Sequence, residues 1–249
     1  MRRTTKRVVA ALLVSMSAVA CGSSGASERT TLTVLAAASL TDVSGDLAGA
    51  YERAHPDVRL RISLAGSQEL ASQVRQGVPA DVLVTADLAT MRALGDRVRD
   101  GTVVATNRLT IVVTPGNPQA VGSLADLGRP GLVVVLAAPD VPAGRYAREV
   151  LDRADVDVIA RSEEPDVRAV LTRVRLGEAD AGIVYTTDAA TAGGDVGTVG
   201  IPADDNVIAS YPAAVVRTTE HPEEAAAFVE WLTSTGASRA FGRAGFGAP

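Results

Sequence analysis

Apolar stretches of strand length alternate with stretches of helical periodicity along most of this chain. Strand-like patterns cover residues 31–36, 58–65, 80–87, 108–118, 131–139, 181–185 and 213–218. Helix-like patterns cover residues 40–53, 68–77, 144–152, 166–176 and 222–233, and a further helix is expected to begin near Leu88. Regular alternation of strands and helices predicts an α/β fold, with mainly parallel sheets that carry helices on both faces.

The first twenty residues are organised as an export signal. Four basic residues precede an apolar segment, residues 8–20, which is too short to span a membrane as a helix. The segment ends in "AVA", the A-x-A form of a secretory cleavage site. We therefore predict a signal peptide over residues 1–20.

The single cysteine of the chain, Cys21, follows this segment directly and precedes the small-residue stretch "GSSGAS". The arrangement resembles a lipobox, in which the cysteine becomes the lipidated first residue of a lipoprotein. It implies a lipidated tether over residues 21–30 and a protein anchored to the outer face of the cell membrane. The A-x-A pattern leaves open the alternative of cleavage to a soluble periplasmic protein.

Removal of residues 1–20 makes the exported chain more acidic. It eliminates four of the 24 Lys and Arg residues and none of the 29 Asp and Glu residues, which leaves a formal net charge of −9. No basic run remains, so nucleic acid is not an expected partner. An anionic ligand stays possible, because the local field inside a cleft decides its binding more than the net charge does.

Small residues and hydroxyl groups gather where predicted strands turn into helices. In "AAASLTD", three alanines and Ser39 occupy such a turn. The first N–H groups of a helix have no partner within that helix, so such a turn can bind an anion without a charged side chain. Alternatively, Ser39 is an ordinary N-cap, and Asp42 completes an approximate capping box.

The same pattern recurs at three other predicted helix starts. Gly66 and Ser67 lie in "LAGSQEL", and Ala143 lies in "DVPAGRYARE". In "EEPDVRAVL", Val167 follows Asp166, which is the expected N-cap. Each helix N-terminus carries about half a positive charge, so four that converge would supply about +2 in total, which suits a dianion.

Five motifs stand in an order typical of one protein family: "AAASLTD", "GSQELASQVRQGVPADVLVTAD", "VPAGRYARE", "DVRAVLTRV" and "GIVYTTDA". On these motifs the chain resembles periplasmic molybdate-binding proteins, the solute receptors of ABC importers, over residues 32–247. The resemblance implies a two-lobed periplasmic-binding-protein-like α/β fold with the ligand in the interlobe cleft. Residues 31–107 plus 212–249 would form lobe 1, and residues 108–211 would form lobe 2.

The resemblance also implies an oxyanion site made only of neutral donors. Ser39 and Ser67 would contribute hydroxyl and backbone N–H groups. Ala143 and Val167 would contribute backbone N–H groups, and Tyr185 its phenol. Apart from the resemblance, Tyr185 can equally be interpreted as a half-buried core tyrosine.

The turn before the second predicted helix departs from the family pattern. Many relatives have a run of serines at this turn, whereas this chain has Gly66-Ser67-Gln68. Ser67 is retained, but the neighbouring donor is altered, which bears on fine selectivity.

The implied function is binding of molybdate, and also tungstate, by a monomer that passes the anion to a membrane permease and its cytoplasmic ATPase. The resemblance implies no cofactor besides this ligand. A pocket without acceptors disfavours phosphate, whose proton would stay unpaired, whereas sulfate must be rejected by cavity size. A receptor for another oxyanion such as sulfate is therefore the main alternative.

An exported hydrolase is the alternative from another class. The sequence contains no G-x-S-x-G motif. His55 and His221 each precede a proline, outside any metal-ligand pattern. We interpret "GRAGFG" near the C-terminus as a loop, and the adjacent Asp204 and Asp205 as solvated. These observations predict that the protein is not an enzyme.

Overall fold

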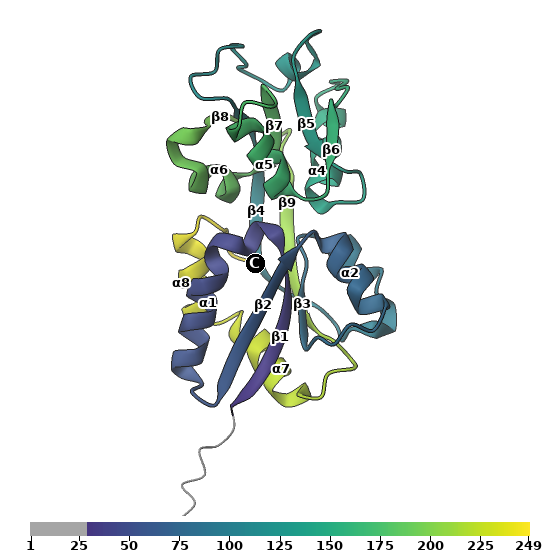
Figure 1. The fold of residues 1–249 in the computed structure, drawn as a ribbon, viewed down its shortest axis with the longest axis vertical. Helices are drawn as coiled ribbons and strands as arrows, with labels where there is room; N and C mark the ends of the chain where they lie inside the picture. Colours follow the sequence, from purple (N-terminus) through teal and green to yellow (C-terminus); the bar gives the residue numbers. More distant parts are fainter. Residues whose placement is uncertain (1–28) are drawn as a thin grey trace, which may run out of the picture.

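Two lobes joined by two long strands make up the computed structural model, which describes residues 29–249 (Figure 1). The predicted signal peptide and Cys21 lie outside the described residues. Among the residues described, no helix has both the length and the apolar content needed to cross a bilayer.

Lobe 1 contains a sheet in which β1 lies between β2 and β3 and runs parallel to both. In the edge strand β2, Leu60 is buried between the exposed Arg59 and Arg61, the alternation expected of a strand with one solvated face. The elements of lobe 1 are β1 (Thr30–Ala37), η1 (Ala38–Leu40), α1 (Thr41–Ala54), β2 (Val58–Ala65), α2 (Ser67–Arg75), β3 (Val82–Val84), α3 (Leu88–Arg92), η2 (Gly95–Arg97), α7 (Pro222–Trp231) and α8 (Thr235–Arg243).

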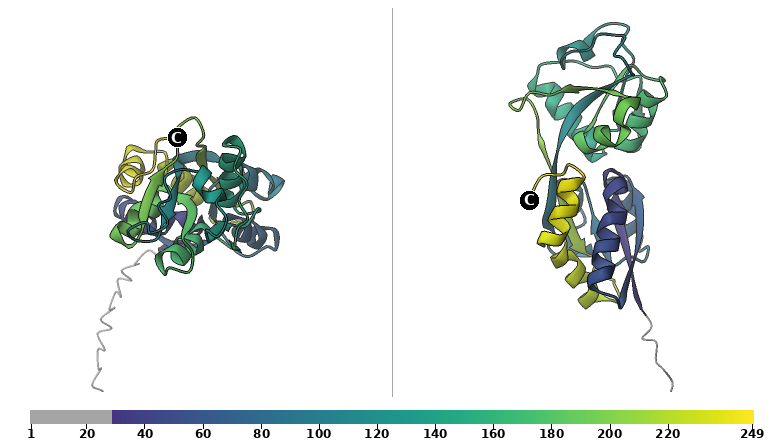
Figure 2. Two further views of the ribbon diagram at one scale, coloured as in Figure 1. Left: turned by 90° about the horizontal axis from the view of Figure 1, so that it is seen from above. Right: turned by 90° about the vertical axis from the view of Figure 1, so that its left-hand side faces the viewer.

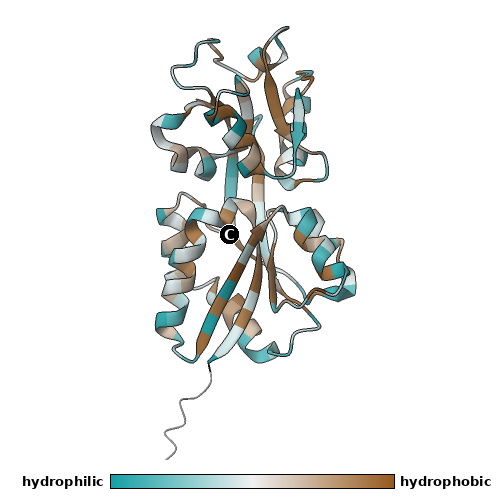
Figure 3. Cartoon of the chain, in the orientation of Figure 1, coloured by the Kyte–Doolittle hydropathy of each residue, from teal (hydrophilic) through white to brown (hydrophobic). Residues whose placement is uncertain are grey.

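Lobe 2 repeats the arrangement with β5 in the middle, parallel to β6 and β7. Its central strand β5 (VVLA) is apolar and brown in Figure 3, whereas the edge strand β6 (SEE) is polar and teal. The elements of lobe 2 are η3 (Ala125–Gly128), β5 (Val134–Ala137), α4 (Pro142–Arg153), β6 (Ser162–Glu164), α5 (Val167–Arg175), β7 (Ala181–Tyr185), α6 (Thr186–Ala192), η4 (Gly193–Asp195) and β8 (Gly197–Gly200).

The two lobes are linked by β4 (Thr102–Val113) and β9 (Ile208–Val215), which are antiparallel to each other. The first half of β4 pairs with β9, and its second half pairs with β7 and β8. The side view in Figure 2 shows the lobes stacked along the long axis with these strands between them. The expected lobe boundaries, after residues 107 and 211, lie within β4 and β9.

Both linking strands begin earlier than their sequence patterns predicted. Residues 102–107 and 208–212 contain polar residues and a proline, so they lack the apolar run that marks a buried strand. They become strands because each supplies the other with backbone partners, for example in the pairs Asn107–Ala209 and Ala105–Tyr211.

Two strands and two α-helices were not predicted, namely β6, β8, α6 and α8. The loop interpretation of "GRAGFG" is wrong in part, because Gly242 and Arg243 end α8. The remainder is held by tertiary contacts: Phe246 is buried, and Gly247 exchanges backbone hydrogen bonds with Thr106 of β4, 3.0 and 2.9 Å long. A glycine-rich sequence carries no signal for such pairing.

The C-terminal helices α7 and α8 pack against the first helix of lobe 1. Tyr51 of α1 contacts Phe228 and Trp231 of α7 edge-to-face, with ring centroids 4.8 and 5.2 Å apart. Such aromatic pairs stabilise packing beyond the area that they bury. The last helices are therefore part of the same core as the first.

Gly144, in the first turn of α4, lies against the end of β5. An added Cβ would lie 2.0 Å from the carbonyl oxygen of Ala138 and 2.4 Å from that of Ala137. Only glycine lets the start of α4 approach the strand this closely.

Substitution Gly144→Ala should therefore lower the free energy of unfolding by roughly 1–3 kcal/mol, as overpacking typically does. The matched control is Gly45→Ala in the exposed middle of α1, where an added Cβ meets nothing within 4 Å. The control should be neutral or stabilise the protein by up to about 1 kcal/mol. Urea unfolding measures both, and equal effects would contradict the packing argument.

Candidate anion-binding site

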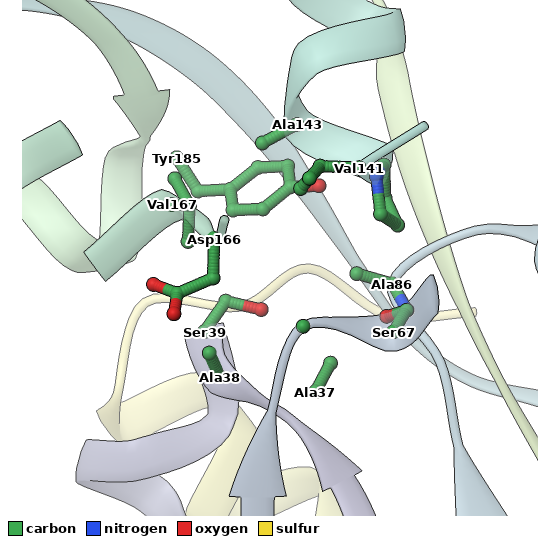
Figure 4. A pocket seen from close by; sticks show the side chains of 12 residues that line it. Ala37, Ala38, Ser39, Ser67, Ala86, Val141, Ala143, Asp166, Val167 and Tyr185 are labelled. Carbon is green, nitrogen blue, oxygen red and sulfur yellow. The ribbon is translucent and has the colours of Figure 1, made fainter. Parts of the chain in front are cut away.

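A pocket with an empty volume of about 210 Å³ lies between the lobes, and all five predicted ligand residues line it (Figure 4). Lobe 1 contributes the end of β1 with η1, the start of α2 and Ala86, the second residue after β3. Lobe 2 contributes the starts of α4 and α5 and the end of β7. The lining residues are Ala37, Ala38, Ser39, Gly66, Ser67, Ala86, Val141, Pro142, Ala143, Asp166, Val167 and Tyr185.

Three helices of nine residues or more begin at this pocket: α2, α4 and α5. Ser67 and Val167 are the first residues of α2 and α5, and Ala143 is the second residue of α4, after Pro142. The N–H groups at these positions have no acceptor within their own helices. Since proline has no N–H group, Ala143 supplies the first one that α4 can offer.

The capping interpretation of Ser39 is wrong. The N-cap of α1 is Leu40, and no side chain caps that helix. The Ser39 hydroxyl lies instead 2.9 Å from the phenol oxygen of Tyr211 on β9, and Ser39 itself is buried. Figure 4 shows its hydroxyl directed into the pocket.

Ser67 is held by a different contact. Its hydroxyl oxygen accepts a 3.0 Å hydrogen bond from the backbone N–H of Ala86, the second residue after β3. A backbone N–H can only donate, so the hydroxyl hydrogen of Ser67 is left to donate elsewhere. Ser67 is therefore a donor at the pocket with both its hydroxyl and its N–H group.

Tyr185 ends β7 and is fully buried, with 1 % of its surface exposed. It belongs to the hydrophobic core, as the alternative interpretation has it, but it is fully and not half buried. Its hydroxyl has no hydrogen-bond partner in the part of the chain described, which costs about 1–3 kcal/mol in a buried position. Burial raises the pKa of Tyr185 well above its ordinary value, so the phenol keeps its proton and presents a donor to the pocket.

The pocket contains no positive side chain among the described residues that line it. Its one charged lining residue is Asp166, whose carboxylate accepts a 2.9 Å hydrogen bond from the N–H of Ala169 and caps α5, as predicted. The electrostatic attraction for an anion therefore comes from hydroxyl groups and helix N-termini.

Contacts between the lobes surround the pocket. Arg145 of α4 donates from Nε to Asp87 Oδ2 at 3.0 Å and from Nη2 to Thr90 Oγ1 at 2.7 Å, both in lobe 1. Gln68 of α2 donates from Nε2 to the carbonyl oxygen of Pro165 at 2.8 Å. These contacts hold the two sets of helix starts against each other.

A second arginine bridges the lobes near the start of α5. Arg168 Nη1 lies 2.7 Å from Asp42 Oδ2 of lobe 1 and 3.2 Å from Asp188 Oδ1 of α6. Neither arginine was among the predicted site residues. Their positions in the sequence could have indicated them, because Arg145 follows the predicted donor Ala143 by two residues and Arg168 directly follows the predicted donor Val167.

Comparison with known proteins identifies the family. Residues 32–247 match the family described as bacterial extracellular solute-binding protein. The chain belongs to this family. It is 36% identical over 253 residues to the molybdate-binding protein ModA of Mycobacterium tuberculosis, with 97% of each chain covered. It is 28% identical to the aconitate isomerase of a Pseudomonas species, with 85% of each chain covered. The predicted relation to solute receptors is confirmed.

Solved structures show the same fold. The periplasmic molybdate-binding protein of Azotobacter vinelandii has a TM-score of 0.75 at 20% identity, and 88% of this chain and 99% of that chain are covered. The sulfate-binding protein SubI of M. tuberculosis has a TM-score of 0.77 at 22% identity, with 88% and 86% covered. The predicted two-lobed α/β fold is confirmed.

Asp188 gives the protein a titratable group behind the pocket. Burial raises the pKa of Asp188 to about 7, although the guanidinium of Arg168 acts to lower it. A carboxyl group with a raised pKa binds its proton more tightly in the folded state. The stability contributed by this proton is present in acid and is lost as the pH rises through about 7.

Substitution Asp188→Asn should remove this pH dependence. Between about pH 5 and about pH 8, the free energy of unfolding of the wild type should fall relative to that of the variant. Urea unfolding at several pH values measures the difference. The exposed Asp195→Asn serves as control and should follow the wild type. Parallel profiles for wild type and Asp188→Asn would show that Asp188 is ionised throughout.

Proposed function

We propose that this protein is an exported receptor that binds molybdate, and also tungstate, in the interlobe pocket and delivers it to an ABC importer. The observation that carries the proposal is the buried, unpaired hydroxyl of Tyr185, which faces donors from both lobes across a small pocket. A buried donor without an acceptor indicates a ligand that accepts hydrogen bonds. Relatives named as molybdate-binding proteins match nearly the whole chain.

Five residues hold the anion in this proposal. Ser39 and Ser67 donate from their hydroxyl and N–H groups, Ala143 and Val167 donate from their N–H groups, and Tyr185 donates from its phenol. Hydrogen bonds to a charged acceptor are stronger than neutral ones, which compensates for the absence of a basic side chain.

Selectivity among tetrahedral anions follows from the same donors. Phosphate carries a proton at neutral pH, and that proton would face another donor; leaving it unpaired costs about 1–3 kcal/mol. Sulfate is fully deprotonated and is not disfavoured in this way, and the sulfate-binding protein SubI shares the fold. Cavity size then decides between sulfate and molybdate, because molybdate and tungstate have longer metal–oxygen bonds than the sulfur–oxygen bonds of sulfate. A sulfate receptor is the second candidate.

Delivery requires partners outside this chain. The proposal assigns a membrane permease and its cytoplasmic ATPase as partners of a monomeric receptor. The predicted signal peptide directs export, and lipidation of Cys21 anchors the protein to the outer face of the membrane. The proposal includes no catalytic role, although one relative is named as an isomerase.

Calorimetric titration of the purified protein with molybdate, tungstate, sulfate and phosphate tests the assignment. We expect tight binding of molybdate and tungstate, much weaker binding of sulfate and negligible binding of phosphate. Equal affinities for sulfate and molybdate would favour the second candidate.

Substitution of Ser39 or Ser67 by alanine should each weaken molybdate binding by about 1–3 kcal/mol, since each removes a hydrogen bond to a charge. This corresponds to roughly 5- to 150-fold in the dissociation constant. Ser63→Ala, on the exposed face of β2, is the control and should bind like the wild type. Unchanged affinity in both pocket variants would exclude the two serine hydroxyls as donors to the anion.

A further inference from the structure

Asn107 is a buried polar residue of β4 that is not among the predicted ligands, and its amide makes four hydrogen bonds. Its Oδ1 accepts from the N–H of Arg108 at 2.9 Å and from Thr186 Oγ1 at 3.0 Å. Its Nδ2 donates to Thr187 Oγ1 at 2.8 Å and to the phenol oxygen of Tyr211 at 3.4 Å. Because the N–H of Arg108 can only donate, the orientation of the amide is fixed.

This orientation determines the role of Tyr211. The phenol oxygen of Tyr211 accepts from the Asn107 amide, and its second neighbour is Ser39 Oγ at 2.9 Å. Ser39 is the one acceptor that the described residues offer to the Tyr211 hydroxyl hydrogen. Tyr211 is fully buried, and burial raises its pKa, so it keeps that hydrogen at neutral pH. The contact between Tyr211 and Ser39 allows either hydroxyl to donate. Pairing the buried Tyr211 hydrogen requires that Tyr211 donates, so that the hydrogen bonds run from Asn107 to Tyr211 to Ser39.

The hydroxyl hydrogen of Ser39 then has one role, which is to donate into the pocket. Since its oxygen accepts from Tyr211, its hydrogen is free to donate into the pocket, where Figure 4 shows the hydroxyl. Ser67 reaches the same state through the N–H of Ala86. One serine is thus oriented by a backbone group and the other by two side chains.

We propose that Asn107 and Tyr211 are positioning residues that fix Ser39 as a donor and so let the pocket reject protonated oxyanions. The proposal rests on the proposed function and adds the residues that decide its selectivity. A serine free to rotate can accept the proton of hydrogen phosphate, whereas a serine that already accepts from Tyr211 is oriented to donate.

Substitution Tyr211→Phe tests the proposal. It keeps the aromatic ring, whose centroid is 5.4 Å from that of Phe246, and removes only the hydroxyl. Dissociation constants for molybdate and for inorganic phosphate are measured by calorimetry, with phosphate also titrated as a competitor of bound molybdate. We expect molybdate binding to weaken and phosphate binding to strengthen or hold, so that the molybdate-to-phosphate affinity ratio falls roughly tenfold.

The ratio separates orientation from simple structural damage. A distorted pocket would weaken the binding of molybdate and of phosphate to the same extent and leave their affinity ratio unchanged. That result would overturn the proposal. The matched control is Tyr51→Phe, a buried tyrosine that packs on α7 in lobe 1, which should leave the ratio as in the wild type.

Asn107→Asp is the second variant, chosen in case Tyr211→Phe fails to fold. A carboxylate at this position can accept from Tyr211 and so release Ser39. The added negative charge should weaken the binding of all anions alike, but the molybdate-to-phosphate affinity ratio should still fall. A wild-type protein that binds none of the anions overturns the proposed function as well. Molybdate binding with an unchanged ratio in both variants overturns the positioning role alone.

Discussion

The structure depends on one constraint: several hydrogen-bond donors line a small interlobe pocket whose one charged side chain within residues 29–249, the Asp166 carboxylate, caps α5. Tyr185 shows this most directly, because its hydroxyl is buried and unpaired among the described residues. The starts of α2, α4 and α5 add N–H groups that their own helices cannot satisfy. Such an arrangement is favourable around a multiply charged acceptor, so the proposed anion binding does not require a net positive charge on the protein.

The rest of the fold serves to bring these donors together. Each lobe places helix starts at the ends of parallel strands, and the linking strands β4 and β9 set the two edges opposite each other. Arg145, Arg168 and Gln68 then join the lobes around the pocket without contributing to its lining. Positive side chains therefore stabilise the contact between lobes, while the donors that line the pocket are neutral. This separation suits a receptor that must also release its ligand.

The hydroxyl groups of the pocket differ from its N–H groups in one respect. A backbone N–H is always a donor, whereas a hydroxyl group donates or accepts according to its neighbours. Ser67 is oriented by Ala86, and Ser39 by Tyr211 and Asn107. The linking strands thus do more than connect the lobes, because they carry the side chains that decide how one of the serines is used.

Local sequence was sufficient to predict the alternation of strands and helices, the donor-bearing helix starts and the cap formed by Asp166. These features depend on residues close together in the chain, such as Asp166 and Ala169. Sequence could not predict the early start of β4 and β9, the ordered "GRAGFG" segment or the partner of Ser39. Ser39 and Tyr211 are separated by 172 positions, and β4 and β9 are strands because they pair with each other. Long-range pairing leaves no periodic signal in either segment, so only the tertiary structure decided it.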